Sequence, residues 1–235
     1  MDNICAKKKV IIFDVGDTLV NLDLLLICSL IGCKPLNFNE IKGLKINLND
    51  YLEHHPPSER KYSSLSFVAN YIMDLNELNN KEEVFNLLEL ECKKSSLWRV
   101  LNDEAVEVLE SIKNKDIKLA VISNSDLNIK QILDEKNILK YFDHVTDSYT
   151  IGISKPDKRI FTHALNELNV LPQDALYIGD LPYLDIMGPL RAGISPILYD
   201  KLDAFSDKIK KISNESNKNL LRIRSLKELS SILNL

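Results

Sequence analysis

Two acidic residues, Asp14 and Asp17, follow a short apolar run, Lys9–Phe13, whose β-branched residues are typical of a strand buried in a parallel sheet. A carboxylate at the end of such a strand is held rigidly, so it can act as a nucleophile or as a metal ligand. The same residue types also suit an aspartate that caps a turn between a strand and a loop. This segment alone leaves both interpretations open.

Hydrogen-bond donors follow a second apolar run, Leu119–Ile122. The next residues are Ser123 and Asn124, whose hydroxyl and amide groups can bind an anionic group but are also common in turns and N-caps. Further along, Lys155 precedes Pro156 near the expected start of a helix. Its ammonium group could point to the same edge of the sheet or simply lie on the surface.

Two more carboxylates, Asp180 and Asp185, follow a third apolar run, Ala175–Ile178. Mg²⁺ prefers oxygen ligands, often one or two carboxylates together with waters and a substrate phosphate. Acidic residues at the start of a helix would give the same pattern. Taken together, the segments offer carboxylates for a cation and a lysine with hydrogen-bond donors for an anion, a combination that suits phosphoryl transfer.

The rest of the sequence predicts a scaffold that brings these strand ends together. Further strands are expected at Pro196–Tyr199 and, from a weaker pattern, at His144–Thr146. Between the strands lie segments in which apolar residues recur at helical spacing, and Asp103 is a candidate N-cap of the first. These segments are Asp103–Lys113, Leu127–Leu139, Asp157–Leu168 and Leu226–Leu233. The alternation predicts an α/β fold with a Rossmann-like parallel sheet, in which ligands bind at the carboxyl ends of the strands.

One region, Val20–Leu97, contains no comparable buried strand. Its apolar residues recur at helical spacing, and Pro56-Pro57 marks a loop. We interpret residues 20–97 as an inserted helical cap domain, within an α/β core formed by residues 1–19 and 98–235. An insertion that leaves from the carboxyl end of the first strand would lie over the site as a lid, which favours a small substrate.

Charge and composition limit the expected partners. The chain has 235 residues and a formal net charge of −4, so it lacks a general affinity for nucleic acid or anionic membranes. The apolar stretch Leu22–Cys33 is far shorter than the ~20 residues of a membrane-spanning helix. The four cysteines form no C-x-x-C pair, which suits reduced thiols and a cytoplasmic location. The oligomeric state is not fixed by any of these features.

In order and spacing, the four segments resemble the four sequence motifs of the haloacid dehalogenase superfamily. The resemblance covers residues 8–20 and 98–235, and the insertion is similar in position and helical character to the type 1 cap of that superfamily. The matching residues are Asp14-x-x-x-Thr18, Ser123-Asn124, Lys155-Pro156 and Gly179-Asp180-x-x-x-x-Asp185, with Gly188–Ile194 similar to the segment that usually follows the fourth motif.

The resemblance implies a phosphatase that acts on a small phosphorylated metabolite. By this resemblance, Asp14 would be the nucleophile that takes the phosphoryl group as an aspartyl phosphate. Lys155 would neutralise the nucleophile and the transferring group. Ser123 and the backbone of Asn124, together with Thr18 and Lys155, would bind the phosphate oxygens.

The resemblance also implies Mg²⁺ as the cofactor. Asp14, Asp180 and the backbone carbonyl group of Gly16 would bind the metal ion. Asp185 would be an outer carboxylate that holds Lys155 or a metal-bound water.

One position departs from the family pattern. In phosphatases of this family the second residue after the nucleophile is normally another aspartate, which protonates the leaving oxygen and then activates water. Here that residue is Gly16, and the acid Asp17 lies one position later. General acid–base help of this kind is worth about 10²–10⁴-fold in rate. Asp17 either takes the catalytic role or is a structural acid of the loop.

Two alternative functions therefore stay open. Slow hydrolysis of an aspartyl phosphate would favour a weak or non-hydrolytic protein, such as a regulatory or binding module. A dehalogenase-type hydrolase also lacks the second aspartate but needs no metal, whereas Asp180 and Asp185 are both retained here. The predicted cap contains no motif that identifies the substrate.

Overall fold

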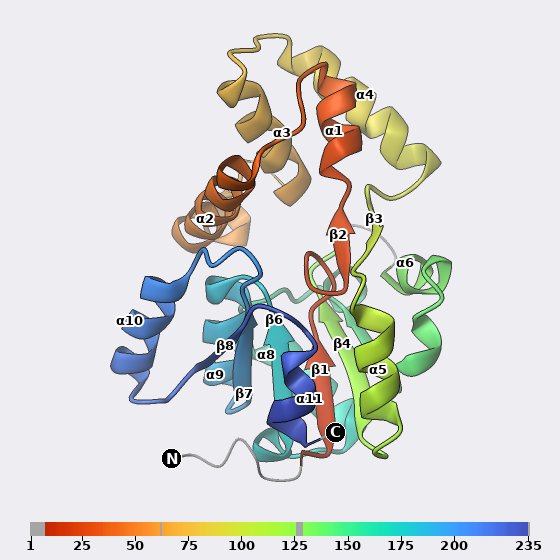
Figure 1. Ribbon diagram of the computed structural model, residues 1–235, viewed down its shortest axis with the longest axis vertical. Coiled ribbons are helices and arrows are strands. Elements are labelled where there is room, and N and C mark those ends of the chain that lie inside the picture. Colours follow the sequence, from red (N-terminus) through yellow and green to blue (C-terminus); the bar gives the residue numbers. More distant parts are fainter. Residues whose placement is uncertain (1–7, 62, 126–128, 235) are drawn as a thin grey trace. The chain divides into compact units, whose positions relative to one another are not determined.

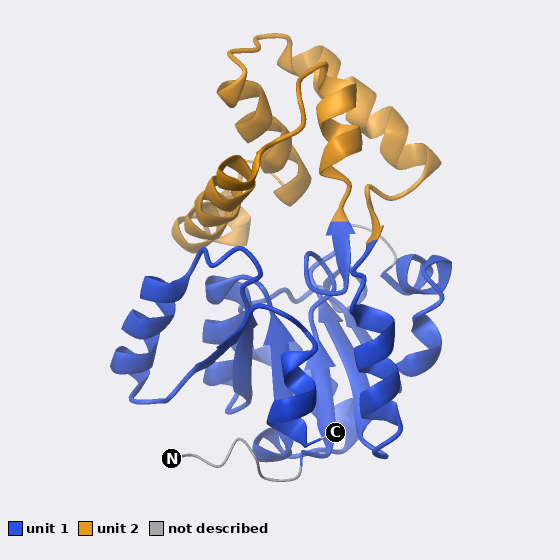
Figure 2. Cartoon of the chain, viewed as in Figure 1, with its two compact units in different colours: residues 1–21, 101–235 blue, residues 22–100 orange. Residues whose placement is uncertain are grey.

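The computed structural model describes residues 8–61, 63–125 and 129–234 (Figure 1). The chain forms two compact units (Figure 2). Unit 1 comprises Met1–Asn21 and Leu101–Leu235, and unit 2 comprises Leu22–Val100. Unit 2 is therefore an insertion in the sequence of unit 1, placed after its first strand.

A six-stranded parallel sheet forms the centre of unit 1. In order across the sheet, the strands are β5 (His144–Asp147), β4 (Lys118–Ser123), β1 (Val10–Phe13), β6 (Ala175–Gly179), β7 (Ser195–Tyr199) and β8 (Leu221–Ile223). At the end of β1, Phe13 pairs with Val121 of β4 and with Ile178 of β6. Because these parallel strands end at the same edge, the residues that follow them come close together.

Both faces of the central strands are buried. Successive side chains of a strand point to opposite faces, and Val10, Ile11, Ile12 and Phe13 are all fully buried. Helix α8 (Lys158–Leu168) covers one face, where its apolar residues join a core cluster with Val10 and Ile12. This burial on both sides explains why each central strand is a nearly continuous apolar run.

The predicted α/β fold is confirmed. The other helices of the described part of unit 1 are α5 (Ala105–Lys113), α6 (Ile129–Glu135), α7 (Ser148–Ile151), α9 (Met187–Arg191), α10 (Ser206–Ser216) and α11 (Glu228–Leu233), with short turns of helix at Leu139–Tyr141, Pro172–Asp174 and Pro182–Ile186. Residues 127 and 128 of the predicted second helix lie outside the described residues. Asp103 is not the N-cap of α5: Oδ1 of Asn102 accepts the Glu104 N–H at 3.1 Å.

Unit 2 is mainly helical. Its helices are α1 (Leu24–Ile31), α2 (Phe38–His54), α3 (Ser64–Leu75) and α4 (Lys81–Lys94), with a short turn of helix at Pro57–Glu59. The chain passes between the two units through β2 (Val20–Leu22) and β3 (Trp98–Leu101), which form a two-stranded sheet. Side-chain caps begin α1, α2 and α3, and in α2 Asn37 and Glu40 form a reciprocal capping box. Among the described helices, none is both long and apolar enough to span a membrane.

Candidate active site

The residues that follow the central strands gather at one edge of the sheet. Asp14 follows β1, Ser123 ends β4, and Asp180 follows β6. Lys155 comes from the loop before α8, and Asp185 from the turn after Asp180. Topology alone thus brings together side chains that lie far apart in the sequence, such as Asp14 and Lys155, which are separated by 141 positions.

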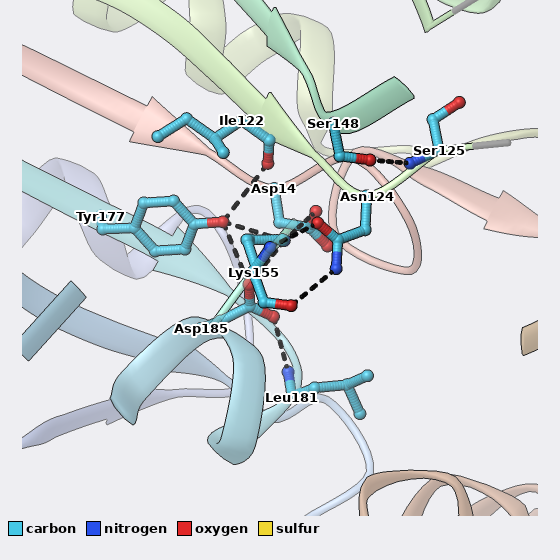
Figure 3. Close-up of polar contacts among 9 residues, drawn as sticks. All are labelled: Asp14, Ile122, Asn124, Ser125, Ser148, Lys155, Tyr177, Leu181 and Asp185. Atoms are coloured by element: carbon cyan, nitrogen blue, oxygen red, sulfur yellow. Dashed lines mark hydrogen bonds and ion pairs between the residues drawn. The ribbon is translucent and has the colours of Figure 1, made fainter. Parts of the chain in front are cut away.

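Lys155 is the centre of a buried polar cluster (Figure 3). Its Nζ donates to Oδ1 of Asp14 at 2.6 Å and to Oδ1 of Asp185 at 2.7 Å. The third acceptor is the hydroxyl group of Tyr177 at 3.0 Å. Only 1% of Lys155 is exposed. Burial opposes the charged form, but the two carboxylates outweigh this effect and raise the pKa of Lys155, so the side chain stays an ammonium.

Asp14 is fixed both to the sheet and to this ammonium group. Its backbone N–H donates to the carbonyl of Ile178 at 2.8 Å, and only 6% of the residue is exposed. Burial raises the pKa of Asp14 to about 6, against the opposing attraction of Lys155. The carboxyl group is therefore ionised at neutral pH, as a nucleophile or a metal ligand must be.

The carboxylates of Asp14, Asp180 and Asp185 fit a divalent cation. Each offers an oxygen atom, and these atoms lie within 4.8 Å of one another. When these three carboxyl groups and Lys155 are all ionised, the cluster has a net charge of −2. Excess charge in a buried site is costly unless a cation compensates it. Oxygen donors with this charge suit Mg²⁺.

Asp185 is held from several directions. Its Oδ1 accepts hydrogen bonds from Lys155 and from Tyr177, the latter at 3.0 Å, and its Oδ2 accepts the Leu181 N–H at 3.0 Å. A Cβ at Gly179 would overlap the Asp185 side chain. The glycine before Asp180 is therefore needed because the Asp185 carboxylate packs directly on the backbone at that position.

The side chain of Asn124 binds the backbone of Lys155 (Figure 3). Its Oδ1 accepts the Lys155 N–H at 2.7 Å, and its Nδ2 donates to the Lys155 carbonyl at 3.0 Å. The Asn124 side chain thus fixes the loop that carries the lysine, and the predicted contact of the Asn124 backbone with phosphate stays a prediction. Ser123, which is 4% exposed, precedes it at the end of β4.

The loop after β1 has a constrained backbone. Asp17 adopts a left-handed conformation with φ 51°, and its N–H donates to the carbonyl of Val20 at 2.9 Å. Thr18 is fully buried, and in the described part of the chain its hydroxyl group has no hydrogen-bond partner. Its carbonyl accepts a hydrogen bond from Nδ2 of Asn102 at 2.8 Å. The predicted contact between Thr18 and phosphate stays a prediction.

The family is decided by sequence comparison. The family described as haloacid dehalogenase-like hydrolase matches residues 8–193. The chain belongs to this family. The resemblance of the four motifs is thereby confirmed, and the parallel sheet is the scaffold that these motifs require.

Named relatives of this haloacid dehalogenase-like hydrolase match only part of the chain. The human haloacid dehalogenase-like hydrolase domain-containing protein 3 is 37% identical over 101 residues, which are 43% of this chain and 40% of the relative. Glyceraldehyde 3-phosphate phosphatase of Methanothermobacter thermautotrophicus is 38% identical over 92 residues, which are 38% of this chain and 40% of the relative. The aligned segments thus span about two fifths of the length of these relatives.

A solved structure extends the likeness in fold to nearly the whole chain. It is the putative HAD-hydrolase YfnB from Bacillus subtilis bound to magnesium, and the TM-score is 0.68. The alignment covers 98% of this chain and 100% of that one, with 19% identity. At this identity the likeness establishes the fold.

Two polar residues of this hydrolase were not predicted from the sequence. Tyr177 binds Lys155, and Asn102 binds the loop after β1. Burial and the neighbouring carboxylates raise the pKa of Tyr177 well above its ordinary value, so it remains a neutral phenol. A tyrosine inside an apolar strand was the available signal, because a buried hydroxyl group needs a hydrogen-bond partner.

Proposed function

We propose that the protein is a Mg²⁺-dependent phosphohydrolase that acts on a small phosphorylated metabolite through an aspartyl phosphate on Asp14. The observation that carries this proposal is the buried ammonium of Lys155, which lies 2.6 Å from Asp14 beside two further carboxylates. The glyceraldehyde 3-phosphate phosphatase and a phosphoserine phosphatase among the relatives support a phosphate substrate.

In the proposed reaction, the Asp14 carboxylate attacks phosphorus, and the bond from phosphorus to the leaving oxygen breaks. The leaving oxygen takes a proton from Asp17 or, if Asp17 only shapes the loop, from water. Water then attacks the phosphorus of the aspartyl phosphate, which releases inorganic phosphate and restores Asp14. Lys155 stabilises the negative charge on Asp14 and on the transferring group throughout. Ser123 and the Asn124 backbone would bind phosphate oxygens.

Asp14, Asp180 and the carbonyl group of Gly16 are the proposed Mg²⁺ ligands. The cation would supply charge neutralisation for the phosphoryl oxygens when bound. Asp185 would keep Lys155 in place by accepting a hydrogen bond from its Nζ at 2.7 Å. We further propose that unit 2 is a helical cap that selects a small substrate.

Gly16 favours slow turnover within this mechanism, because it has no proton to give to the leaving oxygen. Asp17 supplies that proton in one version of the proposal and shapes the loop in the other. Its left-handed backbone and its N–H bond to Val20 support the loop role. A long-lived aspartyl phosphate would suit a second function, namely a regulatory or phosphoryl-carrying protein.

Hydrolysis of an aryl phosphate tests the proposal. We expect turnover with Mg²⁺, loss of turnover in chelator, and no turnover by Asp14→Asn. Asp157→Asn is the matched control, because Asp157 is the half-buried N-cap of α8 and asparagine is also a good N-cap. Turnover that survives in Asp14→Asn would remove the nucleophile, and release of halide from a haloacid without metal would favour the dehalogenase alternative.

A further inference from the structure

Tyr177 reaches the polar cluster from inside the apolar core. It lies in the middle of β6, belongs to the core cluster covered by α8, and is fully buried. Its ring meets that of Phe161 in an edge-on contact with centroids 5.3 Å apart. Because the ring is packed on all sides, its hydroxyl group has a fixed position.

The hydroxyl group has one proton to donate, and the distances indicate where it goes. Its oxygen lies 3.0 Å from Oδ1 of Asp185 and 3.4 Å from the carbonyl of Ile122, so the Asp185 carboxylate is the better acceptor (Figure 3). The same oxygen accepts an N–H of Lys155 at 3.0 Å. An ammonium group has three N–H donors, and Asp14, Asp185 and Tyr177 take all three.

We propose that Tyr177 is a positioning residue that sets the orientation of the Lys155 ammonium relative to Asp14; the inference rests on the proposed function. When the phosphoryl group transfers to Asp14, the contact between Lys155 and Asp14 must change. The contacts to Tyr177 and Asp185 remain, and they hold the ammonium where negative charge develops. A rigid aromatic residue fixed in the core thus determines where the charge of a flexible lysine is placed.

Tyr177→Phe tests this role because it removes one oxygen atom and keeps the ring. We expect kcat to fall about tenfold, the effect of losing one hydrogen bond to a charged group, with KM changed less than twofold. The matched control is Tyr141→Phe, which removes a hydroxyl group bonded to Glu110 in the same unit and away from the cluster. We expect its kcat to match the parent. Assays run well below the unfolding midpoint of the least stable variant, so partial unfolding does not contribute.

A second readout does not depend on activity. Among the described lysines, Lys8 and Lys155 are buried, and buried ammonium protons exchange slowly with water. In ¹⁵N-lysine-labelled protein, we expect a protected ammonium signal that persists in Lys8→Arg and in Tyr141→Phe. In Tyr177→Phe its protons should exchange at least several-fold faster.

The outcomes separate this inference from the proposed function. A parent protein without phosphatase activity would contradict the proposed function. The positioning role would then be tested by comparing the exchange rate of the Lys155 ammonium protons in the parent and in Tyr177→Phe. The inference is overturned if kcat of Tyr177→Phe equals that of the parent, or if KM of this variant changes by the same factor as its kcat. It is also overturned if the parent shows no protected Lys155 ammonium signal.

Discussion

At the scale of single residues, the proposed site has a buried cluster of charged side chains but no side chain at Gly16 to transfer a proton. Lys155 contacts two carboxylates within 2.7 Å, and in the proposed reaction its ammonium group would stabilise negative charge during phosphoryl transfer. Gly16, by contrast, has no side chain to protonate a leaving group. We therefore expect hydrolysis of the aspartyl phosphate to be slower than its formation from a substrate with a good leaving group, because the attacking water needs a base.

Gly16→Asp should raise steady-state turnover by about 10²-fold, since it places a carboxyl group where the family carries its acid and base. In the parent, an aryl phosphate should give a burst of phenol release close to one equivalent per site, because its good leaving group departs without a proton. The burst should shrink in Gly16→Asp, as measured by stopped-flow absorbance.

Asp17→Asn is the control for the proton pathway. If its turnover matches the parent, Asp17 is a loop residue, which its left-handed backbone supports. A burst-free parent whose turnover is lost in Asp17→Asn would contradict the expectation, because Asp17 would then already serve as the acid.

At the scale of secondary-structure elements, buried strands were the most predictable features. Apolar runs such as Val10–Phe13 and Ala175–Gly179 are buried on both faces, so their sequences carry an unbroken signal. Strand β8 has three residues with Arg222 in the middle and lies at the sheet edge, so its pattern is too short to recognise. Helix α10 buries only Ile209 and Ile212, which makes its helical period equally faint.

The part of the candidate site that could be predicted consists of the residues that directly follow the central strands. Asp14, Asp180 and Ser123 follow from the rule that ligands bind at the carboxyl ends of parallel strands. The partners of Asn124 and Tyr177 could not be predicted. The contact of Asn124 with the Lys155 backbone, for example, joins residues 31 positions apart, and the spacing of residue types in the sequence does not indicate it. Side-chain pairing depends on the packed loops, which the pattern of apolar residues does not specify.

Asp23 gives a test at the level of a single helix in unit 2. Its Oδ1 accepts the Leu26 N–H at 2.9 Å as the N-cap of α1, and its Oδ2 accepts Nε of Arg99 at 2.9 Å. Asp23→Ala should lower the free energy of unfolding by about 1–2 kcal/mol. Asp23→Asn should lose less, because asparagine is also a good N-cap. Chemical denaturation measures both.

The loss of unfolding free energy in Asp23→Ala should become smaller as the pH falls. Burial raises the pKa of Asp23, but the Leu26 N–H and Arg99 outweigh it, so the net pKa is lowered on folding. The stabilisation is therefore complete above the unfolded value of about 3.9 and disappears as the pH falls through the folded value. A difference between parent and Asp23→Ala that stays constant down to pH 2 would contradict this account.

At the scale of the whole molecule, the two units divide the work that the proposal requires. Unit 1 contains every residue of the charge cluster, and its fold is shared with a solved hydrolase over nearly the full chain. Unit 2 has its own apolar core, with buried residues such as Ile27, Ile72 and Leu88. In the proposed function, unit 1 therefore supplies the chemistry and unit 2 would select the substrate.

The net negative charge of the cluster formed by Lys155 and the three carboxylates predicts that Mg²⁺ binding increases the stability of the chain. A cation that binds the folded state alone stabilises it by RT ln(1 + [L]/Kd), about 2.7 kcal/mol at a hundredfold excess over Kd. Mg²⁺ should therefore raise the unfolding midpoint at matched ionic strength, as followed by circular dichroism. Asp180→Asn removes one of the three clustered carboxylates and should abolish the shift, whereas Asp157→Asn should retain it. An equal shift in all three proteins would mean that Mg²⁺ acts elsewhere, and the absence of a shift in the parent would mean that the carboxylate cluster does not bind Mg²⁺.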